Sequence, residues 1–255
     1  MNTPTRLGLI SALHQEQTGL IDKLQHAQTV TRGMRSYVSG MLWDIDCVCV
    51  LSRLGKVAAA ATAATLIERF NVTQIVFTGV AGAADTGVRI GDLVVADRLL
   101  QHDMDTSPLF PRFEIPLTGL SRFAADRHLS DQLMQAAKKF IDSDFSDAIE
   151  PADRIKFGLD NHPRVHHGLI ASGDEFISSR TKLADLKTAL PDLLAVEMEG
   201  AAVAQVCFEF GIPFAVIRTI SDGANEDSAV DFTQFIERVA ARYAFHIVKR
   251  LCSNN

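Results

Sequence analysis

The sequence predicts an α/β fold, with one mixed and mostly parallel sheet flanked by helices. Apolar runs of strand length alternate along the chain with longer stretches of helical periodicity, which is typical of such folds. The chain has 255 residues, of which 47% are hydrophobic and 22% charged, so it can bury a sizeable core. Because no repeat or linker interrupts this pattern, we expect a single domain over residues 1–255.

The N-terminal part begins with a buried strand at 6–12, "RLGLISA". A helix is expected next, with an apolar face formed by Leu13, Leu20, Ile21 and Leu24. Alternation over 41–52 predicts a half-buried strand in a hairpin with the preceding "RSYVSG". The alanine-rich helix expected at 57–70 is apolar nearly all round, so it is either deeply buried or packed against another subunit.

A Gly-rich turn, "GVAGAADTG" at 79–87, separates two predicted strands at 74–79 and 92–97. It matches neither GxGxxG nor a P-loop, so both a tight strand exit and a ligand-binding turn stay open. A proline-containing loop and a long helix at about 122–142 follow. The acidic segment 143–163 is interrupted by proline and has little periodicity, so we expect a variable surface excursion there.

The C-terminal part continues the alternation of strands and helices. Strands are expected at 166–172, 193–197 and 214–221, and helices at about 179–188 and 199–210. The last helix begins near residue 232 and has the clearest 3.6-residue spacing of apolar side chains.

Charge and motif spacing argue against several classes of function. The net charge is −6 with no basic block, which gives nucleic-acid binding little electrostatic support. The four cysteines form no CxxC pair and no zinc-ligand spacing, which fits a reducing compartment, so we expect a cytoplasmic protein. The apolar run 7–13 is too short to span a membrane. The pairs His102-Asp103 and His166-His167 lack a third spaced ligand, so no metal or cofactor is implied.

Acidic residues follow several of the predicted strands. Glu16 comes after the first strand, Glu197 and Glu199 follow "LLAV", and Asp222 ends "FAVIRTIS". In open α/β sheets, ligands bind beyond the carboxyl ends of the strands, so these positions point to one site. Carboxyl groups without a nucleophile or a metal suit glycosidic bond hydrolysis, in which one acts as acid and another as base. An acid within the apolar stretch 195–210 is explained either by a structural ion pair or by a role in catalysis, and the stretch alone favours neither.

Seven collinear motifs resemble the 5'-methylthioadenosine/S-adenosylhomocysteine nucleosidases of the nucleoside phosphorylase/hydrolase superfamily. They are "GLISALHQE", "LGKVAAA", "TGVAG", "HDMD", "SGDEFI", "VEMEGAAVAQVC" and "VIRTISD". The resemblance implies a single α/β domain, usually a homodimer, which cleaves the N-glycosidic bond of 5'-modified adenosines with water. The products would be adenine and a 5'-modified ribose, and the implied setting is nucleoside catabolism and methionine salvage.

The resemblance also implies roles for individual residues. Glu16 resembles the residue that activates water, and Asp222 the acid that protonates N7 of adenine. Glu199 resembles the carboxylate that holds the ribose hydroxyls, while Glu197 is expected to be structural. The other substrate-binding residues that the resemblance implies are Met198 on the sugar, Phe176 and Ile177 on the base, Arg218 and Ser221 in the acid and water network, and Val80, Ala81 and Gly82 in the Gly-rich turn.

Some positions depart from the family pattern. Val80 stands where relatives often have serine, and the segment "TSPLFPRFEIP" at 106–116 is unlike the usual one. Leu109, Phe110 and Phe113 in this segment are expected to be apolar contacts at a subunit interface near the 5' end of the site. The identity of the 5' substituent stays open, with futalosine-type nucleosides and 5'-deoxyadenosine among the alternatives.

Two rival functions are kept beside hydrolysis. A phosphorolytic enzyme of the same superfamily would use phosphate as the nucleophile, but a carboxylate at Glu16 repels an anion. A non-catalytic nucleoside-binding protein on the same fold would have no need for Glu16, Glu199 and Asp222 together.

Overall fold

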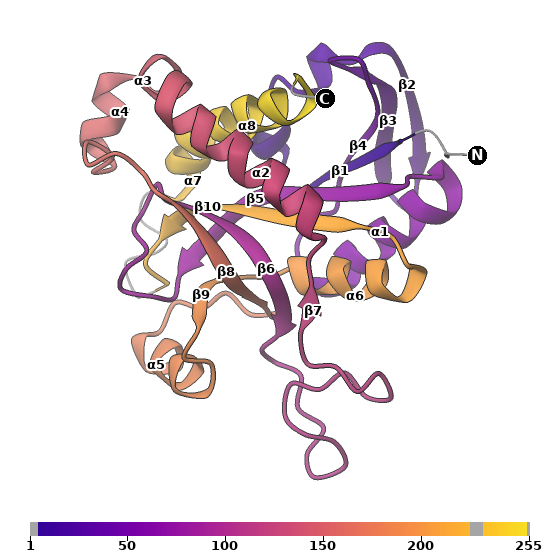
Figure 1. Ribbon diagram of the computed structural model, residues 1–255, viewed down its shortest axis with the longest axis vertical. Coiled ribbons are helices and arrows are strands. Elements are labelled where there is room, and N and C mark those ends of the chain that lie inside the picture. The colour runs from indigo at the N-terminus through magenta and orange to yellow at the C-terminus, as the bar shows by residue number, and fades with distance from the viewer. Residues whose placement is uncertain (1–4, 225–231, 254–255) are drawn as a thin grey trace.

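The computed structural model describes residues 5–224 and 232–253 of the chain (Figure 1). The expected domain of 1–255 therefore has its two ends and the segment 225–231 outside the described residues. Within the described residues the strands are β1 (Leu7–Ser11), β2 (Gln25–Arg32), β3 (Arg35–Leu42), β4 (Ile45–Leu51), β5 (Gln74–Ala83), β6 (Leu93–Gln101), β7 (Phe123–Ala124), β8 (Val165–Ser172), β9 (Leu193–Glu197) and β10 (Phe214–Asp222). The helices are α1 (Lys56–Phe70), α2 (Arg127–Lys139), α3 (Phe145–Ala148), α4 (Pro151–Lys156), α5 (Arg180–Ala189), α6 (Gly200–Phe210), α7 (Phe232–Phe235) and α8 (Ala241–Ser253), with 3-10 turns η1 (His14–Gln17) and η2 (Ile21–Lys23) and π-helical turns η3 (Phe140–Asp144) and η4 (Ile236–Ala240).

The strands form one mixed sheet, in agreement with the predicted fold class. Parallel pairings join β4, β1, β5 and β10 in one group and β6, β8 and β9 in the other. Antiparallel pairings of β5 with β9 and of β10 with β6 connect the two groups. As a result β5, β10, β6, β8 and β9 close into a ring, and β1, β4, β3 and β2 extend from β5 as an open sheet. The sequence did not predict this closure, because pairings between distant strands leave no local pattern.

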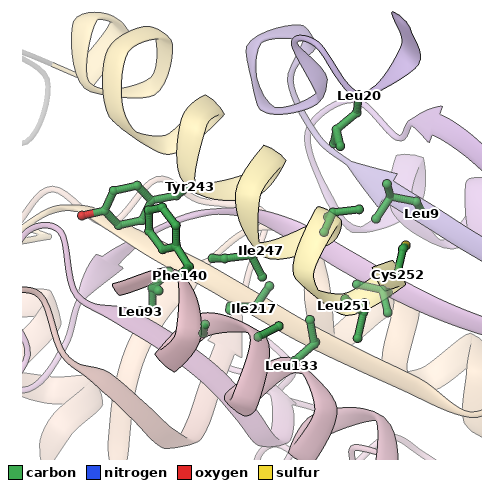
Figure 2. Packing of buried hydrophobic residues seen from close by; sticks show 14 of the residues in the cluster. Leu9, Leu20, Leu93, Leu133, Phe140, Ile217, Tyr243, Ile247, Leu251 and Cys252 are labelled. Atoms are coloured by element: carbon green, nitrogen blue, oxygen red, sulfur yellow. The ribbon is translucent and has the colours of Figure 1, made fainter. Parts of the chain in front are cut away.

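Helices cover the two faces of the sheet. On one face α2 and α8 pack together, and Figure 2 shows side chains of both helices meeting sheet residues such as Leu93 and Ile217. On the other face α1 packs against α6 over a second apolar cluster that includes Phe77 and Val216. The helix α1 is therefore buried on one side only, since Val57 at its start is 81% exposed.

The prediction of a helix after the first strand is wrong. The chain forms the short turns η1 and η2 instead, because Gly19 at φ 79° breaks the helical path. The side chain of Glu16 also folds back to accept hydrogen bonds from the amides of Ala12 and Leu13. These two hydrogen bonds fix the backbone of residues 12–16 around the carboxylate of Glu16.

Two further segments differ from the sequence-based expectation. The Gly-rich segment is not a turn in its first half, because β5 continues through Gly79 and Gly82 to Ala83. The segment 143–163 is not a surface excursion, because it forms α3 and α4 and its Phe145 and Ile149 belong to the core beneath α8. Short helices around proline and acidic residues carry too few apolar positions for a periodicity to be recognised.

The proline-containing segment 106–116 is exposed only in part. Leu109 is 83% exposed, but Phe113 is 8% exposed and packs with Ile177 and neighbouring apolar residues of its own subunit. Phe113, which was expected at a subunit interface, is therefore buried within its own subunit, whereas Leu109 is exposed. Hydrogen bonding of the Phe113 amide to the carbonyl of Met104 closes the loop onto the end of β6.

Candidate active site

One cavity of about 400 Å³ lies beyond the carboxyl ends of β1, β5, β8, β9 and β10. This is where α/β folds bind ligands, because the strand ends bring side chains from separate parts of the chain together. All of the residues proposed from the sequence line it: Glu16, Val80, Ala81, Gly82, Phe176, Ile177, Met198, Glu199, Arg218, Ser221 and Asp222. The roles of these residues stay predictions, but the fold brings all of them into one cavity.

Glu16 is a buried carboxylate held by backbone amides. Its Oε2 accepts hydrogen bonds from the amides of Ala12 at 2.8 Å and Leu13 at 2.9 Å, and its Oε1 accepts one from Val80 at 3.2 Å. Burial raises the pKa of Glu16, while these amides and the charge of Arg218 act in the opposite direction. A fixed carboxylate with a raised pKa is suited to accept a proton from a water molecule.

Asp222 lies at the end of β10. Its Oδ2 accepts a hydrogen bond from the Ser221 hydroxyl at 2.8 Å, and its Oδ1 accepts one from the Ala224 amide at 2.8 Å. A side chain at Gly82 would place its Cβ 3.0 Å from Asp222 Oδ1 and 2.9 Å from the Ala224 Cβ. Glycine at position 82 therefore leaves the room that the aspartate and its loop occupy.

The strand β5 sets the distance between the two acids. Glu16 bonds to Val80, and Asp222 lies against Gly82, two residues further along the same strand. At about 3.3 Å per residue, the two positions on β5 that these carboxyl groups contact are roughly 7 Å apart. Carboxyl groups that act from opposite sides of a sugar with water as nucleophile are about 6.5–9.5 Å apart in inverting glycosidases.

Glu199 is the third acid of the cavity and is 5% exposed. Its Oε1 accepts a hydrogen bond from the amide of Gly55 at 2.8 Å, immediately before α1. Burial, and then the neighbouring charge of Glu197, raise the pKa of Glu199 to about 8. Glu199 is the N-cap residue of α6, in agreement with the helix expected at about 199–210, and its carboxylate turns away to the N-terminus of α1.

The carboxylate of Glu197, and not that of Glu199, binds the N-terminus of α6. It accepts hydrogen bonds from the amides of Glu199 and Gly200, and from the hydroxyl of Ser172. Arg218 donates to Glu197 Oε2 at 2.6 Å, and the guanidinium lies 4.1 Å from the ring centre of Phe77. Glu197 and Arg218 both line the cavity, and each charge of this buried ion pair is matched by hydrogen bonds within the protein.

An aromatic pair and an exposed leucine line the rest of the cavity. Phe176 packs edge to face against Phe232, with ring centres 6.2 Å apart, and is 46% exposed. Leu54, which is 58% exposed, also lines the cavity. Sequence reasoning did not assign Leu54, Glu175 or Phe232 to the site. Leu54 and Glu175 belong to the motifs "LGKVAAA" and "SGDEFI" but had no role predicted for them, and Phe232 lies in none of the seven motifs.

The described residues contain no group of three or more His, Cys, Asp or Glu side chains arranged to hold a metal ion. None of the helices in the described part of the chain combines the length and the apolar character needed to cross a membrane.

Comparison with known proteins agrees with this site. A sequence profile described as the Phosphorylase superfamily matches residues 5–253. The chain is 34% identical over 246 residues to the 5'-methylthioadenosine/S-adenosylhomocysteine nucleosidase of Shewanella denitrificans, a match that covers 96% of this chain and 98% of the relative.

Solved structures give the same result. A 5'-methylthioadenosine/S-adenosylhomocysteine nucleosidase from Neisseria meningitidis, bound to methylthio-immucillin-A, is 30% identical with a TM-score of 0.85, and the match covers 98% of this chain and 100% of that one. The futalosine hydrolase of Helicobacter pylori is also similar, with 28% identity, a TM-score of 0.82 and coverage of 96% and 97%. By full-length sequence identity, fold and the residues of its cavity, the chain belongs to the 5'-methylthioadenosine/S-adenosylhomocysteine nucleosidase family within the Phosphorylase superfamily.

Proposed function

We propose that this protein hydrolyses the N-glycosidic bond of 5'-modified adenosines, with methylthioadenosine and S-adenosylhomocysteine as substrates and adenine as a product. The observation that carries the proposal is the placement of Glu16 and Asp222 in one cavity, both fixed by hydrogen bonds and separated along β5. This arrangement supports an attack by water on one side of the sugar and departure of the base on the other.

In this reaction Glu16 accepts a proton from the attacking water, and Asp222 delivers a proton to N7 of adenine as the bond to C1' breaks. The Ser221 hydroxyl orients Asp222 through its hydrogen bond to Oδ2. Glu199 accepts hydrogen bonds from the ribose hydroxyls, and Met198 packs on the sugar. Phe176 stacks on the base and the Ile177 backbone contacts its edge. Acids around the sugar also stabilise the positive charge that develops on it.

Water is favoured over phosphate as the nucleophile by the charges of the cavity. Its described lining contains five acidic side chains, Glu16, Glu175, Glu197, Glu199 and Asp222, and one guanidinium, that of Arg218. Arg218 is already paired with Glu197, so no cation on this lining is left to hold a phosphate dianion.

The proposal is tested by incubating the protein with methylthioadenosine, with and without phosphate, and measuring free adenine and the sugar product. We expect adenine at the same rate in both reactions, together with methylthioribose. A requirement for phosphate and formation of a sugar phosphate would instead indicate phosphorolysis. No adenine with any member of a panel of 5'-substituted adenosines, futalosine included, would indicate a binding protein.

A pH dependence follows from Glu199. Its carboxylate must be ionised to accept two ribose hydroxyls, but with a pKa of about 8 it carries a proton in most free molecules below that pH. Substrate binding must then displace this proton, so we expect kcat/KM for methylthioadenosine to fall as the pH drops below about 8.

The matching variant is Glu199→Gln, which should lower kcat/KM and lose this limb of the pH profile. Glu209→Gln on the outer side of α6 serves as the control, since Glu209 bonds only to Gln205 among the contacts described here, and it should keep the profile. An unchanged limb in Glu199→Gln would assign the titration to another group.

We also propose that the protein forms a C₂ homodimer. Large apolar side chains are exposed on α1, at Val57, and on the loop after β6, at Leu109. Val57 and Ala61 are exposed one turn apart on α1, and contiguous apolar surface of this kind marks association between subunits. Sedimentation at micromolar concentration should give a dimer, and Val57→Glu should shift it toward monomer.

Ile155→Glu is the control for this experiment. Ile155 is 71% exposed on α4, away from α1 in the fold (Figure 1), so its replacement should leave the dimer intact. An active monomer of the unmodified chain would contradict the proposed interface.

The metabolic role and the cellular compartment are proposed from the reaction and from the cysteines. Cleavage of 5'-modified adenosines belongs to nucleoside catabolism and methionine salvage, and cysteines that are all free fit a cytoplasmic protein.

A further inference from the structure

The motif "HDMD" at 102–105 follows β6 and has no role in the reaction proposed above. Its first aspartate, Asp103, receives two hydrogen bonds from different parts of the chain. Lys56 Nζ donates to Asp103 Oδ1 at 2.6 Å, and the amide of Asp174 donates to Asp103 Oδ2 at 2.9 Å. One carboxylate thus joins the first residue of α1 to the loop that follows β8.

The same two partners are also bonded to each other. The amide of Lys56 donates to Asp174 Oδ1 at 2.7 Å, so Lys56, Asp103 and Asp174 form a closed ring of hydrogen bonds. Lys56 Nζ also donates to Gln101 Oε1 at 3.0 Å, which ties the ring to the end of β6.

A second contact joins the motif to the same loop. The ring of His102 lies on Gly173, where an added Cβ would come within 2.2 Å of His102 Cε1. The amide of His102 also donates to the carbonyl of Ser172 at 2.9 Å. The first two residues of the motif therefore contact Gly173 and Asp174, the first two residues of the loop.

The hydrogen-bonded ring of Lys56, Asp103 and Asp174 connects two segments that contribute to the proposed substrate site. On one side, Lys56 directly follows Gly55, whose amide holds the carboxylate of Glu199. On the other side, Asp174 is two residues before Phe176, on a loop whose Phe176 side chain is 46% exposed. Apart from its edge-to-face contact with Phe232, the side chain of Phe176 is half exposed, so its position depends on where the loop is attached.

We propose that Asp103 is a positioning residue that sets the base-binding loop, with Phe176 and Ile177, at a fixed place relative to the ribose-binding Glu199. This inference rests on the proposed function, because it assumes that these residues bind base and ribose. A nucleoside spans both parts of the site, so it binds best when their separation is already correct in the free protein.

The charge of Asp103 matters for this role. Burial opposes its ionisation, but the bonds from Lys56 and the Asp174 amide outweigh this and lower the pKa of Asp103. Its side chain is 30% exposed and that of Lys56 15%, and ion pairs of this kind contribute little to global stability. Removal of the charge should therefore affect loop position and substrate affinity much more than the melting temperature.

The test compares Asp103→Asn with Asp105→Asn in the same motif. Asp105 bonds to the amide of Ser107 within its own turn and is more exposed, so it is a matched control. We expect Asp103→Asn to raise KM for methylthioadenosine about tenfold, as for the loss of a hydrogen bond to a charged group, with kcat changed less than twofold. Asp105→Asn should behave like the unmodified protein.

A double-mutant cycle with Phe176→Ala separates positioning from general loosening. If Asp103 acts through the loop, Asp103→Asn should change KM less than twofold once the ring of Phe176 is gone. If the two effects on KM multiply, or if Asp103→Asn has the KM of the unmodified protein, the positioning role is wrong.

Lys56→Met removes the other partner of the ion pair and should reproduce the increase in KM. It keeps the test decisive if Asp103→Asn folds poorly, and an unchanged KM in this folded variant would also overturn the proposal. Because all of these comparisons use a protein that releases adenine, their failure differs from failure of the proposed function, in which no adenine appears.

Discussion

Asp222→Asn is expected to lower kcat by at least the 10²–10⁴-fold typical of general acid catalysis, with a smaller effect on binding. Asparagine has the shape of aspartate and can still accept the hydrogen bond from the Ala224 amide, so the loop should keep its place. It has no acidic proton to give to N7 of adenine, so the leaving group departs with its negative charge uncompensated. Adenine release measured at saturating methylthioadenosine checks the loss.

Ser221→Ala is the matched control for this variant. It removes the hydrogen bond to Asp222 Oδ2 but leaves the carboxyl group, so we expect a loss of about tenfold, in line with one neutral hydrogen bond. Near-normal turnover in Asp222→Asn would assign the proton donor to a different group.

Glu16→Gln is expected to reduce kcat by a similar 10²–10⁴-fold, because an amide cannot accept a proton from water. The replacement has a second effect that is peculiar to this site. Both oxygens of Glu16 face backbone amide donors, of Ala12, Leu13 and Val80, so the NH₂ group of glutamine would point a donor at donors. The melting temperature of Glu16→Gln should therefore fall as well, and activity has to be measured below it.

Azide separates the two effects of this variant. It is an anionic nucleophile that needs no base, so it should restore cleavage of methylthioadenosine in folded Glu16→Gln and form a glycosyl azide. Hydrolysis in water at the unmodified rate would show that Glu16 is not the base.

The central strands and long helices were predictable because apolar side chains follow a regular spacing there. The strand β10 and the helix α8 are examples, and both are buried where the pattern predicts. The edge strand β2 was missed, since all eight of its residues are exposed and no apolar alternation marks it. Local patterns report burial, so an element that is not buried leaves no pattern.

The candidate site was predictable from motifs and not from spacing alone. Acids after strand ends pointed to one location, but the seven motifs supplied the separate roles of Glu16, Glu199 and Asp222. The partner of Glu197 could not be predicted, because Arg218 lies 21 residues away and meets it only through the pairing of distant strands. Phe232 was missed for a different reason, because a single aromatic residue is as common in cores as in sites.

The four cysteines offer a way to ask how this fold opens. Cys47, Cys49 and Cys252 are buried in the core beneath α8, and Cys207 in the core on the opposite face of the sheet. Burial raises the pKa of Cys207 and of Cys252 to about 12, so at pH 7 only about one thiol in 10⁵ would be ionised.

A thiol reagent therefore reacts only with molecules in which a core has opened. The labelling rate at each cysteine reports the free energy of the opening that exposes it. Equal opening free energies at Cys207 and Cys252 would mean that the two layers on either side of the sheet unfold as one cooperative unit. A lower value for one of them would identify the layer that opens first, in the native chain and without any substitution.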